Sequence, residues 1–172
     1  VAVDDMMGND STSGQQNIVV RDLTLQGPDV PRIVDKGHGL RLENIDKAYV
    51  INVEVNDVPM DGIYIGYKNK DGGPKGASNV RVTGCKVNRS QRQQIGLIMG
   101  NNVVIDNCTI DGTNKHGAII YAGIDLEPDD AGTPVMNSYV VGNTISNVNI
   151  GIALNGANGE SRNPATVHDN KV

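Results

Sequence analysis

Residues 103–110, Val-Val-Ile-Asp-Asn-Cys-Thr-Ile, are one of six versions of an eight-residue phrase. The other five versions begin at Ile18, Ala48, Val80, Ser138 and Ala165. In all six the third and eighth positions are aliphatic, and the fifth position is Asp, Asn or Gly. These three residue types tolerate a left-handed backbone, and one such residue between two short strands bends the chain sharply. Each phrase therefore predicts a strand, a one-residue corner and a second strand.

A second phrase lies between the copies of the first and begins with glycine. It occupies residues 39–43, 62–66, 96–100, 123–127 and 151–155. Apolar residues alternate with other types along it, which is typical of a strand with one buried face. Every cycle thus contains three short strands, and a stack of such cycles is a solenoid. We predict an all-β fold, a parallel β-helix of about six coils.

The composition agrees with many short strands joined by turns. The chain has 172 residues, with 21 Gly and no Phe or Trp, and its apolar mass is mostly Val and Ile. A hydrophobic fraction of 38% and a net charge of −5 argue against a disordered chain, and no apolar run is long enough to span a membrane. Lys and Arg form no block and no Phe or Trp is interleaved with them, so we expect no nucleic acid partner.

The repeats predict a single β-helix domain over residues 1–172, with 1–16 as a partial first coil and 17–172 as the repeats. A β-helix exposes its core and unpaired strand edges at both ends unless something covers them. The sequence predicts no capping helix. We therefore expect a fragment of a longer chain, or a homo-oligomer such as a trimer, in which the ends are covered.

Stacking in register turns each repeat position into a column of side chains about 4.8 Å apart. The column at the sixth position of the phrase reads Leu23, Val53, Cys85, Cys108, Asn143 and Asn170. Stacked Asn side chains can hydrogen-bond from coil to coil and satisfy groups that are costly to bury. The two cysteines are neighbours in this column, so a disulfide is conceivable, but two buried free thiols are the simpler expectation.

The glycine strand alternates with Asn-Val-x-Ile-x-Asn-x-x-Ile, as in residues 102–110, and this alternation resembles the right-handed parallel β-helix repeat of the pectate-lyase-like superfamily. The resemblance covers roughly residues 17–172. That superfamily includes pectin-degrading enzymes, alginate epimerases and lyases, and phage tailspike depolymerases. The resemblance implies right-handed coiling, a polysaccharide or oligosaccharide partner, and a location outside the cell, on the cell surface or on a virion. It does not by itself imply an activity, since one fold hosts many chemistries.

The outward positions of the glycine strand form the predicted binding face. If the five glycines stack, two columns read Arg41, Tyr64, Ile98, Asp125, Ala153 and Glu43, Gly66, Gly100, Glu127, Asn155. We expect these alternate positions to point to solvent. The long connections 26–38, 67–78, 111–122 and 128–137 would stand beside them as walls, and a walled groove suits a linear polymer.

Carboxylates on this face are the catalytic candidates. Asp125 and Glu127 are two apart on one strand and project the same way, near the separation of a glycosidase pair with a water between them. Asp61 precedes the strand two coils away and completes the predicted catalytic set. The predicted substrate-binding residues offer stacking surfaces and polar groups for a sugar. They are Arg41, Glu43, Tyr64, Arg92, His116 and Tyr121. The alternative is that these carboxylates are simply a solvated surface.

A metal site is the weaker interpretation of one acidic loop. Glu127, Asp129 and Asp130 could ligate Ca²⁺, but three acids beside Pro128 more often make a solvated loop. The spacing of His and Cys does not predict a zinc site. We expect no cofactor.

Two short motifs match those of enzymes in the superfamily. Gly37-His38-Gly39 resembles the Gly-His-Gly of polygalacturonase-type hydrolases, with Asp4 and Asp5 as the paired acids, but Tyr-Ile-Gly at 64–66 replaces the Arg-x-Lys of that family. Residues 121–125, Tyr-Ala-Gly-Ile-Asp, resemble the Tyr-Gly-x-Asp-Pro-His of mannuronan epimerases and related lyases. The His of that motif is absent, and His116 would have to supply it.

The sequence therefore leaves three functions open. The first is an enzyme that binds and degrades a polysaccharide by cleaving glycosidic bonds. The second is a lyase or C5 epimerase acting on a uronic-acid polysaccharide through Tyr121 and His116. The third is a non-catalytic structural or adhesive β-helix of a phage tail or cell-surface protein.

Overall fold

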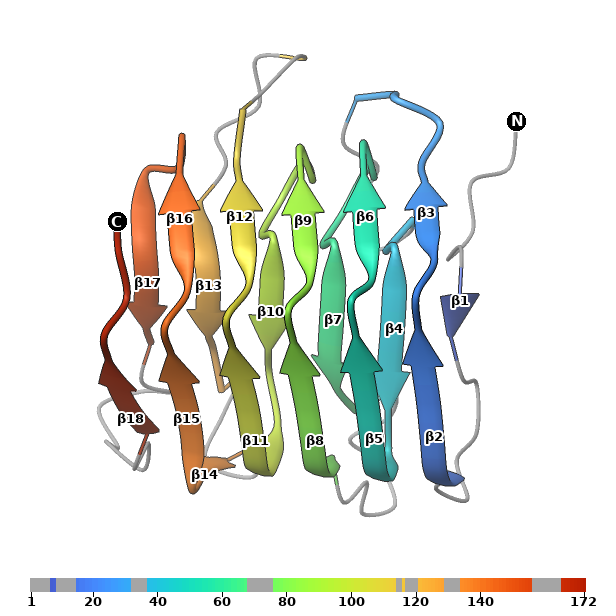
Figure 1. Ribbon diagram of the computed structural model, residues 1–172, viewed down its shortest axis with the longest axis vertical. Helices are drawn as coiled ribbons and strands as arrows, with labels where there is room; N and C mark the ends of the chain where they lie inside the picture. Colours follow the sequence, from blue (N-terminus) through green and yellow to red (C-terminus); the bar gives the residue numbers. More distant parts are fainter. Residues whose placement is uncertain are drawn as a thin grey trace.

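A computed structural model describes residues 7–8, 15–31, 37–67, 76–113, 116, 121–128, 134–155 and 165–172. All paired strands run parallel, and each strand pairs with its counterpart in the next coil. The coils stack from the N-terminal end of the chain, blue in Figure 1, to the C-terminal end, red. The predicted parallel β-helix is confirmed.

Three sheets enclose the core. Sheet A contains the glycine-phrase strands in the order β1-β4-β7-β10-β13-β17. Its strands are Met7–Gly8 (β1), Leu40–Glu43 (β4), Ile63–Gly66 (β7), Ile95–Leu97 (β10), Ala122–Leu126 (β13) and Ile150–Leu154 (β17).

Sheets B and C contain the two halves of the eight-residue phrase, one on each side of the corner. Sheet B comprises Gln15–Arg21 (β2), Ile45–Ile51 (β5), Ala77–Thr83 (β8), Gly100–Asp106 (β11), Ser138–Val141 (β15) and Ala165–His168 (β18), with Val135–Met136 (β14) also paired to β11. Sheet C comprises Thr24–Gln26 (β3), Glu54–Asn56 (β6), Lys86–Asn88 (β9), Thr109–Asp111 (β12) and Thr144–Ser146 (β16).

The corner between sheets B and C has the backbone that the sequence predicts. All six residues at the fifth position of the phrase have positive φ, between 53° and 66°. They are Asp22, Asn52, Gly84, Asn107, Gly142 and Asp169. Side chains reinforce this corner from coil to coil, since Asn52 donates a hydrogen bond of 2.9 Å to Asp22.

The interior contains aliphatic columns that follow the register of the sheets. Leu40, Ile63, Ile95 and Ile124 are adjacent in one such column of sheet A and are buried. Since every coil places the same residue type at the same point, each added coil buries a new layer of apolar surface against the last.

The predicted Asn ladder is confirmed. Asn143 is buried. Its side-chain amide donates a hydrogen bond of 3.0 Å to the carbonyl of Ile105 and one of 2.9 Å to Asn170 Oδ1. Its own side-chain oxygen accepts 2.9 Å from the backbone N–H of Cys108. Cys85 and Cys108 continue the column as buried free thiols, as expected.

Replacing Asn143 with Ala should lower the free energy of unfolding by about 2–3 kcal/mol, because two buried backbone groups lose their partners. The carbonyl of Ile105 and the N–H of Cys108 would both be left without this side chain. Urea unfolding followed by circular dichroism measures the loss. The exposed Asn101 of β11 is the control, and Asn101→Ala should change the stability by less than about 0.5 kcal/mol. Equal losses in the two variants would contradict a buried, fully bonded ladder.

The predicted register of sheet A is wrong in one coil. Gly39 and Gly62 stack as expected, but Ile95 pairs with Ile63, so Gln94 rather than Gly96 occupies the glycine position of this coil. The cause lies in the turn before β10. The Gln94 side chain accepts a hydrogen bond of 3.0 Å from the backbone N–H of Ser90 and donates one of 3.0 Å to the Ser90 carbonyl. These two bonds close the turn without glycine. Gly96 is therefore moved onto the outer face.

Candidate functional site

One outward column of sheet A runs across five coils. Its members are Arg41, Tyr64, Gly96, Asp125 and Ala153, each paired with the next. Tyr64 and Asp125 thus lie on the same face, as predicted, but Gly96 separates them where Ile98 was expected. Gly96 is buried, and a Cβ atom placed on it would lie in contact with Asp61 Oδ2 at 3.4 Å and Gln93 Oε1 at 3.6 Å.

Burial of the carboxylates differs from the sequence expectation. Asp125 is 0% exposed and Glu43 is 1% exposed, although both stand at outward positions. Side chains from neighbouring coils cover Asp125. Gln93 Nε2 donates to its Oδ2, and Asn155 Nδ2 donates 2.8 Å to its Oδ1. Asp125 is therefore not part of a solvated surface, and the sequence did not predict this cover of amides.

Asp125 and Glu127 share one hydrogen-bond donor. Gln93 Nε2 contacts Asp125 and also lies 3.3 Å from Glu127 Oε2, so the two nearest carboxyl oxygens are at most two hydrogen-bond lengths apart, about 6 Å. That upper limit lies below the roughly 6.5–9.5 Å of the water-spaced pair that the sequence predicted, and it is compatible with the roughly 5–5.5 Å of a retaining pair. Burial, and then the charge of Glu127, raise the pKa of Asp125 to about 7, although its bonds to Gln93 and Asn155 act in the opposite direction.

Asp61 is fully buried in a second cluster on the same face. Arg92 donates a hydrogen bond of 2.7 Å to each carboxyl oxygen of Asp61. The backbone N–H of Gln93 donates a third, of 3.2 Å, to Oδ1. His38 Nδ1 stands 3.3 Å from Oδ2. Burial acts to raise the pKa of Asp61, but the hydrogen bonds and positive charge of His38 and Arg92 outweigh it, so the pKa lies below its usual value. Asp61 is therefore ionised in this cluster.

Arg41, Glu43 and Tyr64 continue the face toward the N-terminal coils. Arg41 donates to Glu43 Oε1 through Nε at 2.9 Å and Nη2 at 2.6 Å. The guanidinium carbon lies 6.0 Å from the centre of the Tyr64 ring, and the His38 ring lies 4.9 Å from it on a tilt of 49°. The Tyr64 ring is thus fixed between a cation and an imidazole, with its hydroxyl 3.3 Å from the Tyr67 carbonyl.

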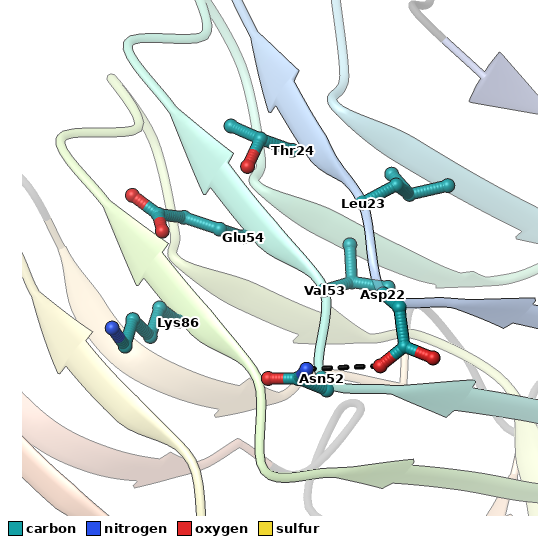
Figure 2. Close-up of a pocket in the computed structure, with 7 residues that line it drawn as sticks. All are labelled: Asp22, Leu23, Thr24, Asn52, Val53, Glu54 and Lys86. Carbon is teal, nitrogen blue, oxygen red and sulfur yellow. Dashed lines mark hydrogen bonds between the residues drawn. The ribbon is translucent and has the colours of Figure 1, made fainter.

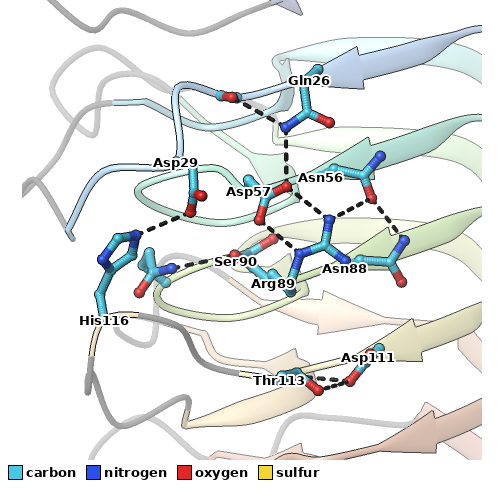
Figure 3. Close-up of polar contacts among 12 residues, drawn as sticks. Gln26, Asp29, Asn56, Asp57, Asn88, Arg89, Ser90, Asp111, Thr113 and His116 are labelled. Atoms are coloured by element: carbon cyan, nitrogen blue, oxygen red, sulfur yellow. Dashed lines mark hydrogen bonds and ion pairs between the residues drawn. The ribbon is translucent and has the colours of Figure 1, made fainter.

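The structure separates the remaining two predicted residues. Tyr121 is exposed, and its hydroxyl lies 3.5 Å from Asn155 Oδ1, which connects it to Asp125. His116 Nε2 instead lies 3.1 Å from Asp29, in the segment that follows β3 of sheet C. Figure 3 shows this contact beside the side chains of Asp57 and Arg89 at the end of that sheet. The residues brought together around Asp125 are therefore Tyr121 and Asn155.

Sequence reasoning did not identify Gln93, and it gave Gly96 the wrong place. The only sequence signal for Gln93 is the Gln-Arg-Gln-Gln run at 91–94, an unusual group of amides just before a strand. His38 was noted only as part of a hydrolase-like motif, and the structure adds its contact with Asp61. Asp4 and Asp5, the acids of that motif, lie outside the described residues, as does part of each predicted wall.

The described part of the chain contains no group of three His, Cys, Asp or Glu side chains that could hold a metal ion. Asp129 and Asp130, the other members of the possible Ca²⁺ site, lie outside that part. The calcium interpretation therefore stays untested.

A separate depression lies at the corner between sheets B and C. Figure 2 shows Asp22, Thr24, Asn52, Glu54 and Lys86 around it, with Leu23 and Val53 between them. Its volume of about 230 Å³ is below the range usual for ligand sites. Because the close carboxyl pair lies on sheet A, we place the candidate site there.

The titration of Asp125 makes stability fall with rising pH. Its pKa is raised to about 7 in the folded chain but is near 4 when unfolded, so between these values the folded state holds a proton that the unfolded state has released. Stability should decrease across that window by about 4 kcal/mol at most, and be level on either side. Asp61 acts in the opposite sense and only at lower pH, since its lowered pKa stabilises the fold until acid protonates it.

Urea midpoints at about pH 4.5, 6 and 8 test this linkage. The wild type should lose stability over this series, and Asp125→Asn should lose much less, because the amide does not titrate. A wild-type profile that rises from pH 4.5 to 8 would contradict the assignment.

Comparison with known proteins gives one family. The family described as "Right handed beta helix region" matches residues 11–172. Among solved structures, the chain is similar to the A-module of the mannuronan C-5 epimerase AlgE6 of Azotobacter vinelandii, with 15% identity and a TM-score of 0.46. That similarity covers 92% of this chain and 54% of the epimerase module, so the chain spans about half the module's length. No curated protein matches in sequence. The described residues include no helix long and apolar enough to cross a membrane.

Proposed function

Because the chain belongs to the family of right-handed β-helix regions, we propose that it binds a polysaccharide across the outer face of sheet A and hydrolyses its glycosidic bonds there. The observation that supports this most is the Asp125 and Glu127 pair. One carboxyl of the pair has its pKa raised to about 7, and the other lies within reach of the same amide nitrogen. Two neighbouring carboxyls with different environments are what a glycosidase needs for its acid and its nucleophile.

In this proposal Asp125 is the general acid and Glu127 the nucleophile. At neutral pH a large fraction of Asp125 is protonated, and its proton passes to the glycosidic oxygen as the bond to the anomeric carbon breaks. The Glu127 carboxylate attacks that carbon and forms a glycosyl ester. Water, deprotonated by Asp125, then hydrolyses the ester and restores both carboxyls.

The substrate must reach Asp125 through its cover. Asn155 is the partner to be displaced, because it is only half-buried and bonds the exposed Tyr121 on its other side. A glycosidic oxygen would take the place of the Asn155 amide at Asp125 Oδ1. The Tyr121 ring beside it offers a stacking surface for a neighbouring sugar. With a glycan partner, we propose a location outside the cell, on the cell surface or on a virion.

A lyase or C5 epimerase is the second candidate. The contact of His38 with Asp61 and with the Tyr64 ring favours it, since such a group could move the proton at the sugar C5. These reactions also need a cation to neutralise the sugar carboxylate. Arg41 and Arg92 are both bonded to carboxylates of the chain, which favours hydrolysis over this alternative.

Product analysis on a polysaccharide panel separates the three functions. Hydrolysis releases new reducing ends without ultraviolet absorbance, and elimination releases an unsaturated sugar that absorbs. Epimerisation changes the sugar without shortening the chain. We expect reducing ends alone. A chain that binds and alters no glycan would be a structural or adhesive β-helix, and the proposal would be wrong.

A further inference from the structure

We propose that the ion pair of Asp61 and Arg92 positions the two catalytic carboxyls, and that it acts through Gln93. This inference rests on the proposed function and assigns three positioning residues to it. Asp61, which the sequence placed in the catalytic set, has both carboxyl oxygens bonded to Arg92. In this proposal Asp61 holds the site in place and exchanges no proton with the sugar.

The side chain of Gln93 is the link to the carboxyl pair. Its amide nitrogen donates to Asp125 Oδ2 and also lies 3.3 Å from Glu127 Oε2, and an amide nitrogen has one hydrogen for each. Turned around, the amide would place its oxygen against both carboxyls, where it could donate to neither. The amide therefore keeps one orientation and fixes the direction of both carboxyls. An acid and a nucleophile act on one glycosidic bond only when both are aimed at it.

The backbone of Gln93 is fastened to the coil before it. Its N–H donates a hydrogen bond of 3.2 Å to Asp61 Oδ1, and its carbonyl accepts one of 3.1 Å from the N–H of Gly62. The preceding residue, Arg92, donates a bond of 2.7 Å to each oxygen of the same carboxylate. The Asp61 side chain thus holds residues 92 and 93 together, and Gln93 extends this constraint to Asp125 in the next coil.

Stability alone gives little reason for this ion pair. The Asp61 side chain is 0% exposed and that of Arg92 is 23% exposed, so both charges lose much of their hydration. Two apolar side chains of similar volume are often no less stable than such a pair. An apolar pair, however, would offer no acceptor for the N–H of Gln93 and no bond between its own two members. The ion pair is therefore explained by the turn that it holds in place.

The charges around Asp125 predict how its titration depends on Gln93. Burial and the charge of Glu127 raise the pKa of Asp125, and the bond from Gln93 acts against them. Arg92 in the preceding coil also lowers this pKa, whereas Asn155 in the following coil is uncharged. Removing the Gln93 donor should therefore raise the pKa of Asp125. Since the acid must hold its proton to act, the alkaline limb of the pH–rate profile should move to higher pH.

Gln93→Leu tests the link itself. We expect kcat to fall about 10–100-fold through misalignment of the carboxyls, with little change in KM and with the alkaline limb at higher pH. Gln91→Leu is the matched control, because Gln91 is also a buried glutamine of this turn but its amide donates to the Arg89 carbonyl. The control should keep the wild-type kcat and profile. A folded Gln93→Leu variant with both unchanged would overturn the inference.

Combined variants test whether the ion pair acts through Gln93. Arg92→Met/Asp61→Leu should lose about as much kcat as Gln93→Leu, even where it keeps the stability of the wild type. Adding Gln93→Leu to it should lower kcat by less than about twofold more, because residues that act as one unit are not additive. Losses that multiply would show that the ion pair does not act through Gln93 and would overturn the inference. If Gln93→Leu does not fold, wild-type kcat in the folded double variant would overturn it.

A titration without substrate separates this inference from the proposed function. Carbon-13 NMR of labelled Asp and Glu carboxyls follows Asp125 and Glu127 directly, with Asp125→Asn and Glu127→Gln to assign the signals. Gln93→Leu should move the titration of Asp125 to higher pH. A wild type that releases no reducing ends would contradict the proposed function, whatever the titration shows. Unchanged titration of both carboxyls in a folded Gln93→Leu variant would overturn the inference alone.

Discussion

Replacing Asp125 with Asn should lower the rate of glycosidic bond cleavage by about 10²–10⁴-fold, the usual contribution of general acid–base catalysis. Asn has nearly the same shape and can keep the bond from Asn155, after a turn of its amide, but it cannot donate a proton to a leaving oxygen. Release of reducing ends from the best polysaccharide of the panel measures the effect. The affinity for the same glycan should change little.

A matched carboxylate distinguishes this effect from a general loss of charge. Asp111 of sheet C bonds Thr113 and Asn147 and lies on another side of the coil, so Asp111→Asn should retain wild-type activity. Glu127→Gln should be as defective as Asp125→Asn, since both carboxyls take part in each turnover. Wild-type activity in Asp125→Asn would exclude this residue as the acid.

The second large effect is on stability. Replacing Arg92 with Met should lower the free energy of unfolding by about 3–5 kcal/mol, because it leaves the Asp61 carboxylate buried without its main partner. Asp61 is 0% exposed and cannot turn to water. Urea unfolding at neutral pH measures the loss.

The double variant Arg92→Met/Asp61→Leu tests the cause. Removing both charges should recover most of the stability, since two apolar side chains of similar volume need no partners. Arg21→Met is the control for loss of a surface ion pair. Arg21 and Asp22 are both well exposed, so the unfolding midpoint should hardly move. A double variant less stable than Arg92→Met would show that Asp61 is not the source of the loss.

The coil architecture was predictable because its determinants are local. Each corner requires one residue that tolerates positive φ, and the chain supplies Asp22, Asn52 or Gly84 at the same place in successive phrases. The ladder from Asn143 to Asn170 follows from the same register. Patterns of this kind are read from single repeats and need no knowledge of distant contacts.

The register of the third coil was not predictable from the glycine pattern. Glycine is the common solution at the turn before the sheet A strand, but the side chain of Gln94 closes that turn by bonding Ser90. A pattern search therefore selects Gly96, two residues too late. The error placed Ile98, rather than Gly96, between Tyr64 and Asp125.

The burial of the candidate site also could not be predicted from the sequence. Alternation along β13 shows correctly that Asp125 points away from the core, but outward does not mean exposed. The cover comes from Gln93 and Asn155, about 30 residues away in either direction. Only the stacking of three coils brings these amides together, and the raised pKa of Asp125 depends on that burial.

A crystal structure of Asp125→Asn with an oligosaccharide of the best polysaccharide in the panel tests the central claim most directly. We expect a sugar on the outer face of sheet A, with a glycosidic oxygen beside residue 125. An oligosaccharide seated on sheet B or sheet C, away from residue 125, would contradict the claim.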